Sequence, residues 1–348
     1  MNILIGNNTL SFLGGSETWV QTLAIQLKEM GHQVFGFSPE LGVIAENLKK
    51  HDIVCYNDLF TSGVKPFSFV LEEKQELQFD IIIANHNHIV DYLRSQFPDT
   101  PIISTIHGII HKTKNEADQI VLAPEHPALD AKVSQFVAVS EEIQETLKRD
   151  YNIDSMIIRN FFDTKQYQAK RPATPGKPKT FLVNSNYFVG NDPVIEIIRE
   201  VSKHYKARLI AVGMNFGASN DVMKAIEDAD IVVGMGRSVM EGVCAGRLGI
   251  VHGRWGTGGI INEHNINDLR QFNFSGRNSG GILFTVEQMI AEIDKNYNPA
   301  TIEWGRNYVL REHNVVHAAE TFLQTAKSLL NKPAESEVII KPYRRANT

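Results

Sequence analysis

The chain has 348 residues, of which 43% are hydrophobic and 22% charged, the composition of an ordinary globular protein with room for two domains. Its formal net charge of -5 excludes a general attraction to nucleic acid or to an anionic membrane, so binding to nucleic acid is not expected. The two cysteines, Cys55 and Cys244, form no disulfide framework and favour a reducing compartment.

The chain opens Met-Asn-Ile-Leu-Ile-Gly, without the basic region and long apolar stretch of a signal peptide. Apolar runs such as 81–84 have the length of a strand, far below the roughly 20 residues that span a bilayer. We therefore expect a cytoplasmic protein, and peripheral contact with a membrane stays open.

In chain order, the first half alternates apolar runs with amphipathic segments. After a strand at 2–5, a helix is expected between Ser16, a fitting N-cap, and Gly31, a fitting stop, because apolar residues recur there at i, i+3, i+4 and i+7. The remaining elements predicted in this half are strands at 33–37, 81–84, 101–106 and 136–139, and helices over 90–97 and from Ser140.

A polar, proline-rich stretch at 164–180 predicts a linker. After it we expect strands at 181–183, 208–212, 231–233 and 248–251, and helices from Asp192-Pro193, over 222–226, from Ser238 and over 299–330. Strands that alternate with helices and are apolar throughout indicate parallel sheets covered on both faces. The expected fold is α/β, with two Rossmann-like domains at 1–165 and 166–300, a helical segment at 301–330 that packs back on the first domain, and a polar tail at 331–348.

The first candidate site is Gly14-Gly15-Ser16-Glu17, where the first loop meets its helix. Glycines let the backbone approach a ligand, and a helix N-terminus offers N–H groups to an anion. The alternative is a tight turn that only connects two elements, and we favour the ligand role. The dinucleotide fingerprint G-x-G-x-x-G is absent, since Asn7 to Leu10 follow Gly6.

Polar residues also end two predicted strands of the first domain. Asn85-His86-Asn87-His88 follow one strand and His107-Gly108 follow the next. Ligands of open parallel sheets bind beyond the carboxyl ends of the strands, which makes His107 a candidate. His86 and His88 lack a third residue with convincing metal-ligand spacing, so a solvated loop is favoured over a metal site.

The third candidate runs from Gly234 to Gly246, behind an apolar strand and into a helix. A glycine turn followed by Arg237 suits a phosphate, and Glu241 could accept hydrogen bonds from a ribose diol. The alternative is a capping box, because Ser238 and Glu241 have the spacing S-x-x-E. A fourth candidate, Arg254-Trp255-Gly256-Thr257-Gly258-Gly259, fits either a glycine-rich ligand loop or a plain flexible one.

Together these segments resemble the retaining GT-B glycosyltransferases of family four, a type common in bacterial polysaccharide synthesis. The resemblance covers about residues 1–330 and rests on the order and spacing of 14–17, 31–34, 104–108, 139–141, 159–163 and 241–246. It implies transfer of a sugar from a nucleotide-sugar to a hydroxyl acceptor, a glycan, lipid-linked or small molecule, with retention and without a metal or other cofactor.

The resemblance also implies roles for residues. The catalytic group would be His107 with Arg237 and Glu241, His107 contacting the transferred sugar. Residues 1–165 would carry the acceptor side, through Gly14, Gly15, Ser16 and Glu17. Residues 166–300 would bind the donor, through Gly236, Arg237, Ser238, Glu241, Gly242, Thr257, Gly258 and Gly259.

Two departures from the family pattern concern the donor diphosphate. Gly234 stands where the family has a glutamate, and the loop at 184–191 lacks the usual Arg and Lys. Arg237 is the residue expected to compensate, because a guanidinium can hold a phosphate bidentately. Three other functions stay open: an epimerase of the same fold, a non-catalytic sugar or nucleotide binder, and a nicotinamide-dependent oxidoreductase, which the missing fingerprint disfavours.

Overall fold

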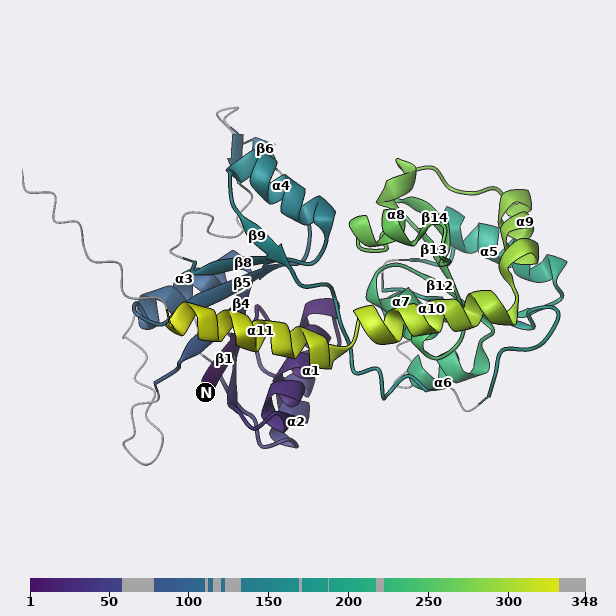
Figure 1. Cartoon of the computed structure of the whole chain (residues 1–348). Helices are drawn as coiled ribbons and strands as arrows, with labels where there is room; N and C mark the ends of the chain where they lie inside the picture. The colour runs from purple at the N-terminus through teal and green to yellow at the C-terminus, as the bar shows by residue number, and fades with distance from the viewer. Residues whose placement is uncertain are drawn as a thin grey trace, which may run out of the picture.

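A computed structural model describes residues 1–57, 78–109, 112–114, 120–122, 133–168, 171–186, 188–216 and 222–331. Its described part forms two α/β lobes, each built around its own sheet (Figure 1). The polar tail predicted at 331–348 lies outside the described residues except for Asn331, which caps the last helix.

The first lobe is a seven-stranded sheet in the order β3-β2-β1-β4-β5-β8-β9, parallel in every pairing described. Its strands are β1 (Asn2–Gly6), β2 (Gln33–Phe37), β3 (Val54–Tyr56), β4 (Ile81–Asn85), β5 (Ile102–Ile106), β8 (Gln135–Ala138) and β9 (Ser155–Ile157). Its helices are α1 (Gly15–Glu29), α2 (Val43–Lys49), α3 (Asn87–Gln96) and α4 (Glu141–Tyr151), and β6 (Lys112–Lys114) pairs antiparallel with β7 (Ile120–Leu122). All residues of β4 and β5 are buried, which is why these strands read as continuous apolar runs.

The second lobe is a five-stranded sheet in the order β11-β10-β12-β13-β14, with only the last pair antiparallel among the strands described. The strands are β10 (Thr180–Asn184), β11 (Arg208–Val212), β12 (Ile231–Gly234), β13 (Leu248–Gly253) and β14 (Gly256–Ile260). The helices are α5 (Pro193–His204), α6 (Val222–Asp228), α7 (Arg237–Cys244), α8 (Ile266–Gln271) and α9 (Val286–Asn296), with single 3₁₀ turns η1 (Met214–Phe216) and η2 (Arg277–Ser279). Asp192 caps α5 as predicted, accepting from the amide of Val194 at 2.9 Å.

The helix expected over 299–330 is two helices, α10 (Pro299–Glu312) and α11 (Val315–Leu330). Asn314 breaks the run and caps α11, its Oδ1 accepting from the amide of Val316 at 3.0 Å. Helix α10 packs on α7 of the second lobe, whereas α11 packs on α1 of the first (Figure 1). The prediction of one helix was wrong because apolar periodicity does not register a cap inside a run.

The chain crosses between the lobes twice, and the two crossings are hydrogen-bonded to each other. The amide of Phe162 donates to the carbonyl of His313 at 3.1 Å, and the amide of Val315 donates to the carbonyl of Phe162 at 3.2 Å. This bridge ties the two crossings into one connection between the lobes.

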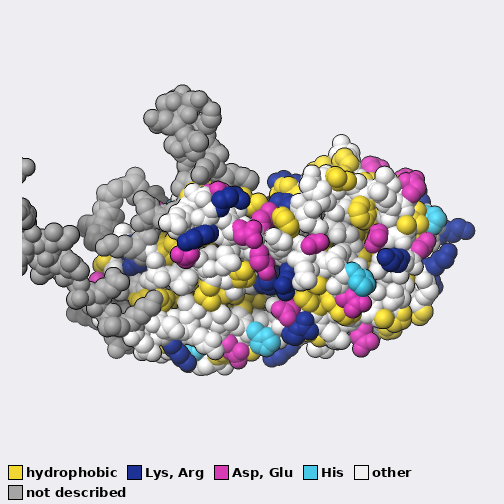
Figure 2. Space-filling view, turned by 45° about the horizontal axis from the view of Figure 1, so that its top comes forward, with side chains coloured by type: hydrophobic (Ala, Val, Ile, Leu, Met, Phe, Trp, Pro, Cys, Tyr) yellow, Lys and Arg dark blue, Asp and Glu magenta, His cyan; other side chains and the backbone are white. Residues whose placement is uncertain are grey.

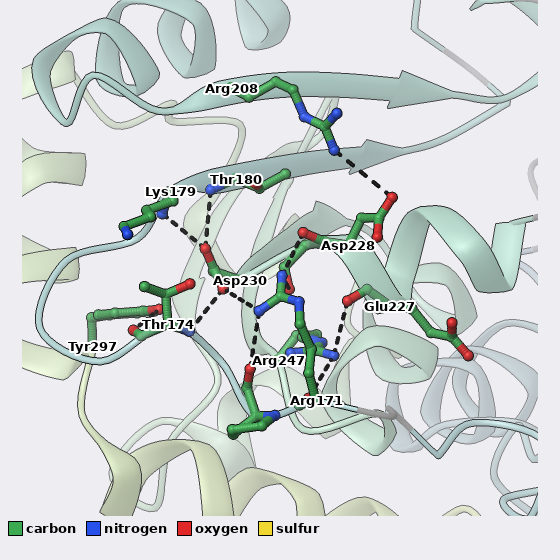
Figure 3. Close-up of polar contacts among 12 residues, drawn as sticks. Arg171, Thr174, Lys179, Thr180, Arg208, Glu227, Asp228, Asp230, Arg247 and Tyr297 are labelled. Carbon is green, nitrogen blue, oxygen red and sulfur yellow. Dashed lines mark hydrogen bonds and ion pairs between the residues drawn. The ribbon is translucent and has the colours of Figure 1, made fainter.

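A linker was expected at 164–180. From Arg171 onward this segment is hydrogen-bonded to the second lobe. The buried Asp230 carboxylate accepts from Arg171 Nη1 at 3.1 Å and from the amides of Thr174 and Lys179 at 2.8 Å each (Figure 3). Burial opposes ionisation of Asp230, yet these donors hold its pKa below the usual value. Residues 171–180 therefore belong to the second lobe.

Candidate active site at the domain junction

The carboxyl ends of β1, β4 and β5 bring polar side chains together at the edge of the first sheet. Asn7 follows β1 and Asn85 ends β4; Asn85 Nδ2 donates to Asn7 Oδ1 at 3.1 Å. Asn7 in turn donates to the carbonyl of Thr9 at 2.8 Å. Adjacent parallel strands place their ends side by side, so this edge is where a ligand of the sheet would lie.

His107 follows β5 at this edge. Its ring meets the indole of Trp19 edge to face, with centroids 5.2 Å apart. Burial, reinforced by the nearby His86, lowers the pKa of His107 to about 3, so its imidazole is neutral at physiological pH. Nε2 has no hydrogen-bond partner among the residues that the structure describes. A neutral ring of this kind can exchange a hydrogen bond with a ligand hydroxyl but cannot supply a positive charge.

The interpretation of His86 and His88 as a solvated loop is wrong for His86. This residue is the N-cap of α3, with φ of 65°, and burial lowers its pKa to about 4. His88 is exposed, with Nε2 at 2.8 Å from Asn8 Oδ1. Within the described ranges, no group of three or more His, Cys, Asp or Glu side chains is placed to hold a metal ion.

The glycine turn at 14–17 opens α1, but Ser16 is not its cap. The N-cap is Gly14, with no side-chain hydrogen bond, and the Ser16 hydroxyl donates to Glu17 Oε1 at 2.9 Å. A Cβ at Gly14 would crowd the buried Glu17 carboxylate, which would have to shift to admit a side chain there. The first-turn amides of α1 are therefore left to water or to a ligand.

The capping box, the alternative given for Ser238 and Glu241, does not form. Helix α7 begins at Arg237 behind an N-cap Gly236 with φ of 55°, and Ser238 Oγ donates to the carbonyl of Met235 at 2.9 Å. Glu241 Oε1 instead accepts from Arg237 Nε at 2.7 Å. The amide of Gly236, expected to meet a phosphate, donates to the carbonyl of Phe274 at 2.8 Å. The amides of Arg237 and Ser238 remain candidates for an anion.

Arg237 joins the two lobes. Its Nη1 donates to Thr18 Oγ1 of α1 at 3.1 Å, and its guanidinium lies 6.0 Å from the Phe162 ring. The side chain is 19% exposed and that of Glu241 11%. Burial opposes the charge of Arg237, but Glu241 and Tyr167 hold its pKa above the usual value. The first turns of α1 and α7 are thus joined at one half-buried, charged guanidinium.

Gly234 has no room for the glutamate of the family pattern. A Cβ there would lie 2.7 Å from Ser238 Oγ and 2.8 Å from the carbonyl oxygen of Asn184. Gly242 is similarly tight, since a Cβ would lie 2.5 Å from Val232 Cγ2. Glycine at both positions lets α7 pack closely on β12 and β10.

The glycine cluster at 254–259 is not a loop, so both interpretations of it need correction. Residues Gly256–Ile260 form β14, paired with β13. Thr257 is 3% exposed; its Oγ1 lies 2.6 Å from His252 Nδ1 and accepts from the amide of Phe284 at 2.9 Å. A Cβ at Gly258 would lie 2.5 Å from Leu269 Cδ2. These contacts give Thr257 and Gly258 a packing role, and their donor-binding role stays a prediction.

Several charged residues at the junction were not predicted. Arg277 Nε donates to Glu142 Oε1 at 2.9 Å, and Arg159 Nη1 donates to Glu141 Oε2 at 2.8 Å. Figure 2 shows basic and acidic side chains meeting where the lobes join. Arg254 lies with its guanidinium carbon 4.4 Å from the centre of the Trp255 ring. Arg254 belongs to the candidate segment 254–259 and was therefore singled out from sequence. The pairing of Arg277 with Glu142 was not, because the two residues are 135 positions apart.

Comparison with known proteins now bears on this geometry. Residues 13–166 match the model of Glycosyltransferase Family 4. A glycosyltransferase from Rickettsia africae has 15% sequence identity and a TM-score of 0.65, covering 95% of this chain and 99% of its own. Anabaena HepE with UDP and glucose has 14% identity and a TM-score of 0.62, covering 94% and 100%. No curated protein sequence matches the chain.

The chain has the fold of these GT-B glycosyltransferases. The family match covers most of the first lobe, and the likeness in fold extends over both lobes. A sucrose-phosphate synthase from Thermosynechococcus elongatus shares the architecture at 12% identity, with a TM-score of 0.54 and coverage of 94% and 98%. The expected α/β fold of two Rossmann-like domains is confirmed, as is the resemblance to the family.

The residues predicted from sequence separate into two groups. Arg237 and Glu241 lie together at the junction, and Arg237 contacts Thr18, the residue that follows the turn at 14–17. Thr257 lies buried in β14. None of the helices in the described ranges is both long and apolar enough to cross a membrane.

Proposed function

We propose that this glycosyltransferase moves a sugar from a nucleotide-sugar to a hydroxyl acceptor, with retention and without a metal ion. The observation that carries the proposal is the meeting of the N-termini of α1 and α7 around Arg237. Leaving diphosphates need positive potential, and two helix N-termini with a half-buried guanidinium supply it.

The roles follow from the contacts. Arg237 and the amides of Arg237 and Ser238 would hold the leaving diphosphate, and Glu241 would accept a ribose hydroxyl. A carboxylate has about four lone-pair sites, so Glu241 can keep its bond from Arg237 while it accepts another. Neutral His107 would contact the transferred sugar, and the turn at 14–17 would face the acceptor. Catalysis would rest on positioning and charge stabilisation.

Uridine diphosphate sugars are the first donors to test. Two of the similar structures, both of Anabaena HepE, hold UDP with glucose and UDP-glucose. A thermal-shift screen of UDP-, GDP-, ADP-, CMP- and TDP-sugars should show a rise in Tm with one nucleotide. A ligand at 100 times its Kd adds about 2.7 kcal/mol to stability.

The Glu241→Ala variant should lose that shift, because it lacks the proposed ribose acceptor. Glu200→Ala is the matched control, since Glu200 pairs with Lys203 on the exposed face of α5, with 52% of its side chain exposed. Equal shifts in Glu241→Ala and the unmodified protein would remove Glu241 from the donor site. Absence of a shift with every nucleotide would contradict the proposal itself.

A nucleotide-release assay separates transfer from its alternatives. Transfer releases free nucleotide only when acceptor is present, whereas an epimerase converts the nucleotide-sugar without release. A non-catalytic binder would show the thermal shift and no change in the donor. The anomeric configuration of the product, read by NMR, decides between retention and inversion.

A further inference from the structure

Thr18 is the one residue of α1 with a described hydrogen bond to the side chain of Arg237. It lies half-buried in the first turn of α1, one residue after Glu17 and four after the N-cap Gly14. The sequence alone indicates no role for Thr18, because its partner is 219 positions away.

The Thr18 hydroxyl has a fixed polarity. Oγ1 donates to the carbonyl of Gly14 at 2.6 Å, as threonine commonly does to a carbonyl four residues back in a helix. A hydroxyl has one proton and two acceptor lone pairs, so with its proton on Gly14 it faces Arg237 as an acceptor. Arg237 has only donors, and the two groups therefore match in a single orientation.

Arg237 is thereby held from both sides of the junction. Nε is fixed by Glu241, one turn along α7, and Nη1 by Thr18, in the other lobe. A long side chain that loses one of these hydrogen bonds regains rotamer freedom. The charge would then no longer be preorganised at the reacting phosphate, and its stabilising effect there would be weaker. Without Thr18, the guanidinium would be anchored by the second lobe alone.

We propose that Thr18 is a positioning residue, which holds Arg237 in its working orientation when the two lobes come together. The inference rests on the proposed function, since it concerns the cation assigned to the donor diphosphate. The lobe assigned to the acceptor would thereby contribute to donor chemistry. The Thr18 hydroxyl orients Arg237, and its own orientation is fixed by the hydrogen bond that it donates to the carbonyl of Gly14, in the turn assigned to the acceptor.

The variants that test this are Thr18→Val, which removes the hydroxyl at nearly constant shape, and Thr18→Ser, which keeps it. Thr22→Val is the matched control. Thr22 is also half-buried on α1, and its hydroxyl donates to the carbonyl four residues back at 2.7 Å, with no described contact to Arg237.

The first test measures steady-state kinetics with the donor. A lost hydrogen bond to a charged group corresponds to a fall of roughly tenfold in kcat/KM for the donor. We expect that fall in Thr18→Val, mainly in kcat, with nucleotide Kd changed less than about twofold because the nucleotide sits on the second lobe. Thr18→Ser should stay within about threefold and Thr22→Val within about twofold of the unmodified enzyme. In an Arg237→Ala background, Thr18→Val should add less than about twofold.

The second test measures amide hydrogen exchange without ligand. Thr18→Val should speed exchange of the Met240 amide, which donates to the carbonyl of Gly236 in α7. Arg237→Ala should speed exchange of the Thr18 amide, which donates to the carbonyl of Gly14 in α1, while Thr22→Val leaves α7 unchanged.

Equal effects of Thr18→Val and Thr22→Val, full additivity with Arg237→Ala, or unchanged exchange at α7 would each overturn the inference. If each variant speeds hydrogen exchange in the other helix but no nucleotide-sugar is turned over, the proposed function is rejected and the contact between Thr18 and Arg237 is established.

Discussion

Arg237 is a charged residue of the second lobe that donates a hydrogen bond to the first lobe. It contacts Glu241 in its own helix and Thr18 in the other lobe. If it stabilises the leaving diphosphate, Arg237→Ala should lower kcat by on the order of 10²–10³, the scale for losing one preorganised donor. Steady-state kinetics with the donor identified by thermal shift would measure the fall.

Arg199→Ala is the control for that substitution, because Arg199 pairs with Glu196 on the surface of α5, with 38% of its side chain exposed. Its removal should change kcat less than about twofold. A fall of less than threefold in Arg237→Ala would withdraw Arg237 from catalysis. Its neighbour Glu241 was accessible from sequence as an i, i+4 pair, whereas Thr18 was not.

At the scale of elements, Asp230 decides where the second lobe begins. Its side chain is 1% exposed, and it holds Arg171 and the amides of Thr174 and Lys179 in one network (Figure 3). Asp230→Asn removes the negative charge and replaces one acceptor oxygen by an NH₂ group. The donors from Arg171, Thr174 and Lys179 remain, and one of the two acceptor atoms that they need is gone. We expect a loss of about 3–5 kcal/mol in unfolding free energy, measured by urea denaturation.

Asp228→Asn, two residues away, is the control. Asp228 is 42% exposed and lies 3.8 Å from Arg208, so the change should cost less than about 0.5 kcal/mol. Equal losses of unfolding free energy in both variants would show that the hydrogen bonds of Asp230 to residues 171–180 do not stabilise the fold. Proline and glycine content predicted a linker here, and it could not reveal that a carboxylate 50 residues on would fix the segment.

At the scale of the whole molecule, buried histidines make stability depend on pH. Burial lowers the pKa of His86, His252 and His313 to about 4 and that of His107 to about 3, against about 6.5 in the unfolded chain. Between these values the unfolded chain binds more protons, so stability is complete above about pH 6.5 and falls as the pH falls. Each buried histidine contributes a slope of about 1.4 kcal/mol per pH unit.

The urea midpoint should therefore drop between pH 7 and pH 5 and change much less between pH 7 and pH 8. Asp230 and Glu141 do not interfere, because their pKa values are lowered and they titrate below this window. His313→Asn, which can still donate to the carbonyl of Asn160, should reduce the drop. A midpoint independent of pH from 7 to 5 would contradict the burial of these rings.

The sequence by itself determined the two α/β sheets, most strands to within one or two residues, and the resemblance to the family whose model matches residues 13–166. Buried parallel strands are apolar runs and helices are periodic, so both signals are local. It also placed Arg237 beside Glu241, because one turn of helix is local too.

Only the tertiary structure decided which side chains share the junction. It paired Arg237 with Thr18 and Arg277 with Glu142, placed Thr257 inside a strand, and divided the last helical run between the lobes. The two pairings depend on contacts between residues far apart in the chain, whose free energy appears only when both lobes are folded, so no pattern in neighbouring residues encodes them.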